Sequence, residues 1–530
     1  MTRPWLGLLL GLCPLTGVQA QTSTDASSSV PAASAAALSE KDFLGDMPIV
    51  LSVSRLPQRL DETPGAVTIL DRDMIRASGV RDVADLLRQV PGFRVTDSFE
   101  SNTPQASYHT GLGDYSNHIQ VLVDGRSVYS PYLQGSTGPG LQTVAIDDIE
   151  RIEVMRGSNS AAYGARAFFG TINIVTRDTL STLGPMVRVA GGDNRIWDRM
   201  ARFGWGDHRA SFRLSADQRR DDGLLGSSGP DAVSRLNFRA DVHPGGANEY
   251  EFRAGQSIIN AYVGFAGSVG NNARERSIRT NYAQFDWRRT MGPNQDLAVQ
   301  LSHMSEVDND HFAYTPLPGL LIDFGGTASA DQVSAQHTFR ASPELRVVWG
   351  AEWRHEHIRS RPLYNTDDIF TTDFSRAFAN AEWRLHPQLV LNAGGMLEHN
   401  SLSGSAFSPR LMLNWRVADG HTLRLGTSRA FRPPSVYEKF SDVRYHLGST
   451  LLDVTNRARG QVDSEKIRAT ELGYLGELPS IGLNLDVRVF EEDVSGFIQN
   501  VNYPFADGIF GNGQAVDFVN EQSFKIRRLE

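Results

Sequence analysis

Runs of adjacent carboxylates are the features of this sequence that come nearest to a catalytic or metal site. Asp147-Asp148 and Glu491-Glu492-Asp493 supply the oxygen ligands that Ca²⁺ prefers, and paired carboxylates also serve as general acid and base. No nucleophile or carboxylate pair lies in a recognisable catalytic motif, so we interpret both runs as solvated turns. We therefore expect no catalytic residue, no metal site and no cofactor, and we do not expect an enzyme.

One segment has the composition for binding through main-chain hydrogen bonds. The stretch MPIVLSVSRL, from Met47 to Leu56, alternates apolar and small polar residues as a β-strand does. It follows a flexible linker at 21–45 that is rich in Ser, Ala and Thr and cannot bury enough apolar surface to become ordered. The strand is thus presented on a tether and is free to pair with the sheet edge of another protein. The alternative is that it forms the first strand of the folded domain.

Residues 1–20 have the pattern of a secretory signal peptide. Arg3 gives a positive start, an apolar run follows from Leu6 to Leu12, and Val18-Gln19-Ala20 offers a cleavage site. The run is too short to span a bilayer as a helix, and the alternative is an unusual buried helix. The single cysteine, Cys13, lies inside this segment. The mature chain therefore lacks cysteine, which excludes a disulfide framework and a thiolate metal site.

Length and composition leave two classes of protein open. The 530 residues are 40% hydrophobic, and beyond the signal segment no stretch is long and apolar enough for a membrane helix. The chain is therefore either soluble or crosses a membrane as strands in which apolar and polar residues alternate. The net charge of −9 provides no basic patch, so we expect no nucleic-acid partner.

From about Asp46 to Arg177 the chain mixes helical and strand-like patterns. Apolar residues at helical spacing occur at Val83, Leu86, Leu87 and Val90. Pro91-Gly92 ends that helix, and Asp124-Gly125 within HIQVLVDGRSVY is a strong hairpin signal. Strands are expected at Ile152–Met155 and Thr171–Thr176. These patterns predict a compact α/β module.

From about Met186 to the end the pattern has a period of two. In SRLNFRADV, Leu236, Phe238, Ala240 and Val242 share one face, and Arg235, Asn237, Arg239 and Asp241 share the other. About sixteen such segments occur without a compensating helix. Short turns such as His243–Glu249 alternate with long polar connections such as Arg432–Lys466. The region predicts a mainly β fold, a transmembrane antiparallel β-barrel with a lipid-facing outside and a wet inside.

Three segments of the first region resemble, in order and spacing, the plug-domain signatures of the TonB-dependent outer-membrane receptors. They are ETPGAVTILDRDMIRASGVRDVADLLRQVPGF, VLVDGRSVY and IDDIERIEVMRGSNSAAYGARAFFGTINIVTR. SRAFRPPSVYE (Ser428 to Glu438) and TELGYLGEL (Thr470 to Leu478) resemble barrel motifs of the same family. The resemblance implies an α/β plug domain at 56–180 inside the lumen of a β-barrel at 181–530, in the bacterial outer membrane.

The same resemblance gives the N-terminal strand a role. Members of the family carry a TonB box ahead of the plug, a short extended segment that leaves the plug when ligand binds and adds a strand to the energy-transducing protein TonB. The stretch 46–55 looks like that box, and the residues expected to bind TonB are Ile49, Val50, Leu51, Ser52 and Val53. The implied partners are TonB with its ExbB/ExbD energising complex, outer-membrane lipid and a small-molecule metal chelate.

The resemblance implies active import of a scarce ligand, with a ferric siderophore expected and cobalamin or haem as alternatives. Haem receptors of the family pair a FRAP motif with NPNL and an axial histidine. Here FRPPS (Phe431 to Ser435) and His446 are present, but NPNL is absent. The side chains expected to contact ligand at the plug apex are Tyr108, His109, Tyr115, Tyr129 and Tyr132. The alternative is that they pack between the plug and the barrel wall.

The sequence departs from the family pattern in several places. Ser158 stands where the family commonly has proline, and Phe168-Phe169 where small residues are usual. The chain ends at SFKIRRLE without a terminal aromatic residue, and its sixteen or so strand segments compare with about twenty-two in the family. We therefore expect a C-terminally truncated fragment, or a frameshifted product, of a longer receptor. Rival functions are a passive outer-membrane porin or adhesin, whose lumen the plug would occlude, and a soluble all-β carbohydrate-active enzyme.

Overall fold

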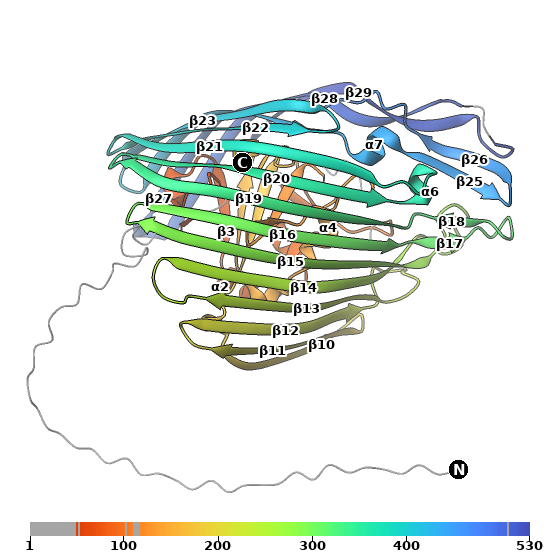
Figure 1. Cartoon of the computed structure of the whole chain (residues 1–530), viewed down its shortest axis with the longest axis horizontal. Coiled ribbons are helices and arrows are strands. Elements are labelled where there is room, and N and C mark those ends of the chain that lie inside the picture. The colour runs from red at the N-terminus through yellow and green to blue at the C-terminus, as the bar shows by residue number, and fades with distance from the viewer. Residues whose placement is uncertain (1–48, 51–52, 101–102, 110–116, 506–507) are drawn as a thin grey trace, which may run out of the picture. The chain divides into compact units, whose positions relative to one another are not determined.

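The computed structural model describes residues 49–50, 53–100, 103–109, 117–505 and 508–530. The signal peptide and the flexible linker predicted from the sequence lie outside these residues. The described chain forms a small mixed α/β part followed by a large antiparallel sheet (Figure 1). No helix among the described residues is long and apolar enough to cross a membrane.

The first part contains a five-stranded sheet with the order β3–β8–β9–β6–β7. Its strands are β3 (Ala66–Leu70), β6 (Ile119–Val123), β7 (Arg126–Ser127), β8 (Ile149–Arg156) and β9 (Gly170–Thr176). The β6–β9 pair is parallel and the other pairs are antiparallel. Two small antiparallel pairs accompany this sheet: β1 (Ile49–Val50) with β2 (Gln58–Arg59), and β4 (Phe93–Thr96) with β5 (Gln105–Tyr108).

Short helices connect these strands. They are α2 (Arg72–Ser78), α3 (Val83–Leu86), α4 (Gly138–Leu141) and α5 (Ser160–Tyr163), with 3₁₀ turns η1 (Leu60–Glu62), η2 (Leu87–Gln89), η3 (Ile146–Asp148) and η4 (Leu180–Thr182). Asp82 caps α3 by accepting a hydrogen bond from the backbone N–H of Ala84, and the helical stretch continues through η2 to Gln89. The helix predicted before Pro91-Gly92 is thus present, and Gly92 has the positive φ of 77° that glycine tolerates.

The second part is an eighteen-stranded sheet. Its strands are β10 (Gly184–Gly192), β11 (Ile196–Gly206), β12 (Ala210–Asp221), β13 (Asp231–Val242), β14 (Asn248–Val263), β15 (Arg274–Gly292), β16 (Gln295–Asn309), β19 (Gly326–Ser342), β20 (Leu345–Arg359), β21 (Phe370–His386), β22 (Leu389–Asn400), β23 (Gly404–Ala418), β24 (His421–Arg432), β25 (Asp442–Leu447), β26 (Thr450–Arg457), β27 (Glu465–Leu478), β28 (Leu483–Pro504) and β29 (Gln514–Leu529). Because β24 pairs directly with β27, the hairpin β25–β26 extends from the wall, and sixteen strands form the wall itself. This agrees with the sixteen or so segments predicted from the sequence.

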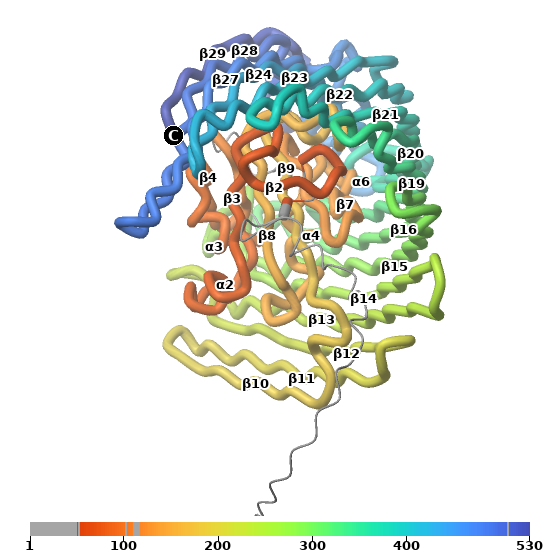
Figure 2. The backbone as a smooth tube through the Cα atoms, turned by 90° about the vertical axis from the view of Figure 1, so that its left-hand side faces the viewer, coloured from red at the N-terminus to blue at the C-terminus, as the bar shows by residue number. Residues whose placement is uncertain are grey.

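The strands of this sheet follow chain order from β10 to β29 and pair antiparallel, apart from one parallel bridge between Asn456 of β26 and Val516 of β29. Figure 2 shows the sheet curving around the first part, which lies on its concave side. We call the first part the plug. Among the described residues no pairing joins β10 to β29.

Side chains alternate along the barrel strands between an inner face toward the plug and an outer face away from it. On β20 the inward Glu352, Arg354 and Glu356 are buried against the plug, whereas the outward Trp349 and Trp353 are 54% and 43% exposed. An apolar face exposed on the outside is stable only in lipid, and the charged face on the inside is covered by a polar plug. The predicted lipid-facing outside and polar inside are confirmed.

The two ends of the barrel sheet differ in loop length. At one end β15 and β16 are joined by Pro293-Asn294, and β19 and β20 by Pro343-Glu344. At the other end the connections include 310–325, with the hairpin β17 (His311–Ala313)–β18 (Leu321–Asp323), and 360–369, with α6 (Arg361–Tyr364). They also include 433–464, with α7 (Val436–Phe440), and 505–513. The end with the short turns also carries a 3₁₀ turn, η5 (Pro479–Ile481). We call the end with the longer connections the long-loop end.

Candidate functional site

The N-terminal strand β1 is docked on the plug. Ile49 pairs with Arg59, and Val50 pairs with Gln58, so each strand contributes only two residues to the ladder. The Val50 side chain is 1% exposed and belongs to a small apolar cluster with Val53, Val67 and Met155. The segment therefore has a partner strand in this structure, although a short one. Leu51 and Ser52 of the predicted TonB box lie outside the described residues.

The partner strand β2 is itself fixed to the barrel wall. The Gln58 side-chain amide donates to Glu382 Oε2 at 2.6 Å and to Asn392 Oδ1 at 2.8 Å. Arg55 donates from Nε to the Ala162 carbonyl at 2.7 Å, and its guanidinium lies 4.1 Å from the ring centroid of Phe378. The N-terminal strand is thus held by a two-residue ladder and an apolar cluster, whereas the strand that holds it is hydrogen-bonded to the wall.

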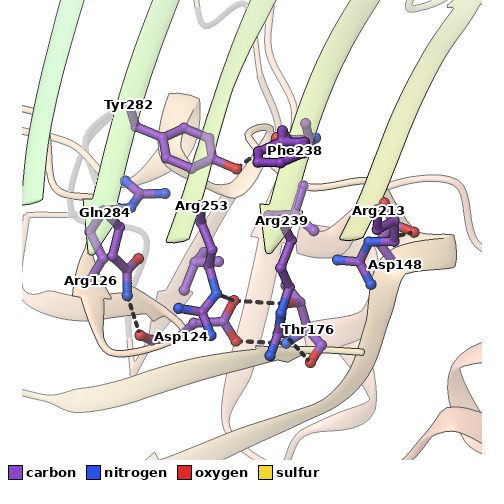
Figure 3. A pocket seen from close by; sticks show the side chains of 13 residues that line it. Asp124, Arg126, Asp148, Thr176, Arg213, Phe238, Arg239, Arg253, Tyr282 and Gln284 are labelled. Carbon is purple, nitrogen blue, oxygen red and sulfur yellow. Dashed lines mark hydrogen bonds and ion pairs between the residues drawn. The ribbon is translucent and has the colours of Figure 1, made fainter. Parts of the chain in front are cut away.

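The hairpin β6–β7 contacts another part of the wall, at β14 and β15. Asp124 and Gly125 have φ values of 48° and 80°, as a type I′ turn requires, and the hairpin predicted from this dipeptide is confirmed. The Asp124 carboxylate accepts hydrogen bonds from the Thr176 N–H at 2.8 Å and the Thr176 hydroxyl at 2.7 Å, and lies 3.0 Å from Arg253 Nε (Figure 3). The Asp124 carbonyl accepts from Gln284 Nε2 at 2.8 Å.

A cavity of about 20 Å³ lies beside this hairpin, which is room for about one water molecule. Arg126 reaches it from β7, and its guanidinium lies 4.0 Å from the ring centroid of Tyr282 (Figure 3). None of the three guanidinium nitrogens of Arg126 has a hydrogen-bond partner among the described residues. Burial lowers the pKa of Arg126 to about 10. The hairpin therefore combines a fully paired carboxylate with a cation held only by an aromatic ring.

The interpretation of the two carboxylate runs as solvated turns is wrong for Asp148 and Glu492, which are buried. The other three carboxylates, Asp147, Glu491 and Asp493, are 24%, 43% and 51% exposed. Asp148 in η3 is 1% exposed and lies 3.0 Å from Arg202 Nη1. Glu492 lies inside β28, is fully buried, and is 2.8 Å from His109 Nε2. The physical reason is the alternation of β28, which turns Glu492 toward the plug while Glu491 faces outward. Among the described residues no group of three or more His, Cys, Asp and Glu side chains is arranged to hold a metal ion.

The side chains predicted to contact ligand fill the boundary between plug and barrel. The Tyr108 hydroxyl donates to Glu530 Oε1 at 2.8 Å and accepts from Arg488 Nη1 at 2.9 Å. The ring of Tyr129 lies under the guanidinium of Arg166, 3.7 Å from its centroid. The Tyr132 hydroxyl donates to the Phe324 carbonyl, and His109 faces Glu492 as described above. These four side chains occupy the packing position that the sequence analysis gave as the alternative, and Tyr115 lies outside the described residues.

A larger cavity, of about 310 Å³, separates the plug from β12, β13 and β14. It lies at the long-loop end, because Asp221 ends β12 and Asp231 begins β13 there. Arg81 at its plug side binds Asp198 and Asp221, each at 2.7 Å, and Arg219 lies 2.7 Å from Asp82. The sequence does not predict this cavity, because its lining comes from several separate chain segments, none of which carries a motif.

Comparisons with known proteins agree with this architecture. The TonB-dependent receptor plug domain family matches residues 59–171, and the TonB-dependent receptor-like β-barrel family matches residues 163–523. An iron-regulated outer membrane virulence protein of Vibrio cholerae is 26% identical over an alignment of 443 positions that covers 77% of this chain and 63% of the relative. A vitamin B12 transporter of Vibrio vulnificus is 28% identical over 479 residues, covering 85% of this chain and 70% of the relative.

Solved structures share the fold. A variant of the ferric enterobactin receptor of Pseudomonas aeruginosa superposes with a TM-score of 0.72 at 17% identity, covering 89% of this chain and 77% of that chain. This chain spans less than two thirds of the length of the Vibrio cholerae relative. The barrel match alone covers more than half of the chain, and the plug match lies ahead of it. The chain therefore belongs to the TonB-dependent receptors, an outer-membrane receptor and transporter family in which a plug fills a β-barrel.

Proposed function

We propose that this protein imports a ferric siderophore across the bacterial outer membrane, driven by TonB. The observation that carries the proposal is the docking of the N-terminal strand. Val50 and its neighbour are held by a two-residue ladder, whereas β2 is hydrogen-bonded to the barrel wall through Gln58. A strand that is held by only two residue pairs is released at a small cost in free energy. Its free main chain can then pair with the sheet edge of a partner.

We propose the class of ligand from the names of the relatives. The Vibrio cholerae relative is named for iron regulation, and a ferrienterobactin receptor of Escherichia coli is 23% identical over 71% of this chain. These names favour a ferric siderophore. Cobalamin is the second candidate, because the Vibrio vulnificus vitamin B12 transporter matches 85% of this chain at 28% identity.

The route begins at the long-loop end, which we assign to the cell exterior because outer-membrane barrels carry their longer loops there. Ligand would bind between the loops and the plug, over the cavity lined by Asp82, Asp221 and Asp231. Release of β1 at the periplasmic side then gives TonB a strand to pull, so that the plug shifts and opens a path. A passive porin is disfavoured because the plug fills the concave side of the barrel sheet (Figure 2).

The test is uptake of labelled ferric siderophores and cobalamin by cells that express the protein with Val50 intact or replaced by proline. Val50→Pro removes a backbone N–H and prevents a continuous ladder with TonB, so energised uptake should be lost. Arg59→Pro is the matched control, because the φ of −66° at Arg59 already suits proline and the change leaves the main chain of β1, which would pair with TonB, intact. Uptake lost in the first variant and kept in the second supports the proposal. Uptake that is equal in both variants and in the wild type would refute TonB-driven import and would indicate a passive pore.

A further inference from the structure

The outward face of the barrel sheet carries a histidine pair at the edge of its apolar band. On β20 the outward side chains run from Val347 through Trp349 and Trp353 to His355 and His357. Side chains two residues apart on a strand point to the same face, so the two histidines continue the row of tryptophans toward the long-loop end. Of the thirteen histidines in the chain, these are the only two separated by a single residue.

The two imidazoles face one another through the same nitrogen. His355 Nε2 lies 2.7 Å from His357 Nε2, with ring centroids 4.3 Å apart and ring planes at 88°. Two imidazole nitrogens that bind one ion at about 2.0–2.1 Å each are roughly 3 Å apart. Opening the pair by a few tenths of an ångström therefore suffices for both nitrogens to reach one ion.

Each histidine has a second partner that orients its ring. His355 Nδ1 lies 2.6 Å from Asp373 Oδ1 on β21, where the two residues are cross-strand neighbours. The carboxylate accepts the Nδ1–H, so Nε2 of His355 keeps its lone pair. On the other side, Ser329 of β19 is the cross-strand neighbour of His357, with Oγ 3.5 Å from Nδ1. A carboxylate behind one imidazole is the arrangement that fixes metal-ligating histidines in proteins.

From this geometry we propose that His355 and His357 form a two-histidine chelate for a divalent transition-metal ion such as Cu²⁺, Zn²⁺ or Ni²⁺. Imidazole nitrogens select these ions over Mg²⁺ and Ca²⁺, which prefer oxygen. Asp331, the other cross-strand neighbour of His355, is engaged by His303 Nδ1 at 2.7 Å, so the protein supplies two ligands. The remaining coordination positions point away from the barrel, where water or an anionic oxygen completes the shell.

The site is separate from the import route. His355 is on the outer face of the strand whose inner face carries Arg354 and Glu356 toward the plug. The proposal therefore does not depend on the proposed function: loss of metal binding and loss of TonB-driven uptake are distinguishable, because they arise from variants on opposite faces of the wall.

The test uses the full chain in detergent, titrated with Cu²⁺ and followed by electron paramagnetic resonance, with pulsed measurements that count coordinated imidazoles. We expect one Cu²⁺ with two imidazoles in the wild type. His355→Gln and His357→Gln should each remove the two-imidazole signal, and Asp373→Asn should weaken Cu²⁺ binding about 10- to 100-fold while keeping it.

His399→Gln is the matched control. His399 is also an outward histidine, on β22, two strands from β20, but its Nδ1 lies 3.0 Å from Ser405 Oγ and no second histidine faces it among the described residues. The His399→Gln substitution should therefore leave the two-imidazole signal unchanged. Far-ultraviolet circular dichroism checks that each variant keeps its strand content. The proposal is overturned if wild type lacks a two-imidazole signal, or if that signal survives in folded His355→Gln and His357→Gln.

Discussion

The plug hairpin provides the sharpest test of how the plug is held in the barrel. The Asp124 carboxylate accepts two hydrogen bonds from Thr176 and pairs with Arg253, and both charged side chains are less than a tenth exposed. Removing one partner of a buried pair costs about 3–5 kcal/mol. Arg253 keeps a second carboxylate, Asp286, at 2.6 Å, so we expect Asp124→Asn to cost less than this range, about 2–3 kcal/mol.

The expected loss of stability is local, and it can be measured by amide hydrogen exchange. A loss of about 2–3 kcal/mol accelerates exchange through local opening roughly 30- to 150-fold in peptides that cover β6, β7 and the end of β9. Asp207→Asn is the control, because Asp207 caps an exposed turn between β11 and β12 and should leave those peptides unchanged. Protection of the hairpin in Asp124→Asn equal to that in the wild type would refute the reasoning that this pair anchors the plug.

The same carboxylate gives a pH dependence with a defined sign. Burial alone would raise the pKa of Asp124, but Arg253, Arg239 and the hydrogen bonds from Thr176 outweigh it and lower the pKa. A carboxyl group whose folded pKa is lowered contributes stability above its unfolded pKa of about 3.9 and loses that contribution as the pH falls through the folded value. The difference in hairpin protection between wild type and Asp124→Asn should therefore be constant above about pH 5 and shrink below about pH 4.

Three further variants test neighbouring features by the same exchange measurement. Arg126→Met should not lower hairpin protection, because it replaces a buried cation without hydrogen-bond partners among the described residues by a side chain that suits the site; a large loss would show that the cation is needed. Gly140→Ala should cost about 1–3 kcal/mol because its Cβ would lie 2.4 Å from the Val128 carbonyl, whereas Gly270→Ala, with open space around it, should be neutral. Asp82→Ala should lower the free energy of local opening of α3 by about 3 kcal/mol, because it removes a helix cap and the partner of Arg219. Asp71→Ala removes only the cap of α2 and should cost about 1 kcal/mol. Equal losses in the two variants would refute this difference.

The local structure was predictable from the sequence where a residue's neighbours in the chain decide its conformation. The wall strands follow from strict alternation, because each residue meets either lipid or the polar interior. The turn at Asp124-Gly125 follows from the positive φ that both residues tolerate. Helix α3 follows from the apolar spacing of Val83, Leu86 and Leu87 ahead of Pro91-Gly92.

The contacts between plug and barrel were not predictable, because they join residues far apart in the chain. Tyr108 and Arg488 are separated by 380 positions, and Gln58 and Asn392 by 334. For this reason the prediction that Glu492 is solvated fails, because the residue lies at an inward position of β28. The histidine pair escaped notice for the same reason, since Asp373 and Ser329 become its neighbours only through strand register.

The plug is held by ion pairs of unequal strength, and this sets an order for its displacement. Arg81 and Asp198 are 26% and 23% exposed, and Arg188 and Asp147 are 55% and 24% exposed, so water replaces these partners at a cost of at most about 1 kcal/mol each. Asp124 and Arg253 are 6% and 9% exposed, and the cavity beside them has room for only about one water molecule, so bulk water does not replace their partners while the hairpin is seated. We therefore expect the contacts of Arg81 and of Asp147 with the wall to open before the β6–β7 hairpin does. Since β1 is held by two residues of ladder, a pull applied there meets the short pairing first and the buried hairpin last.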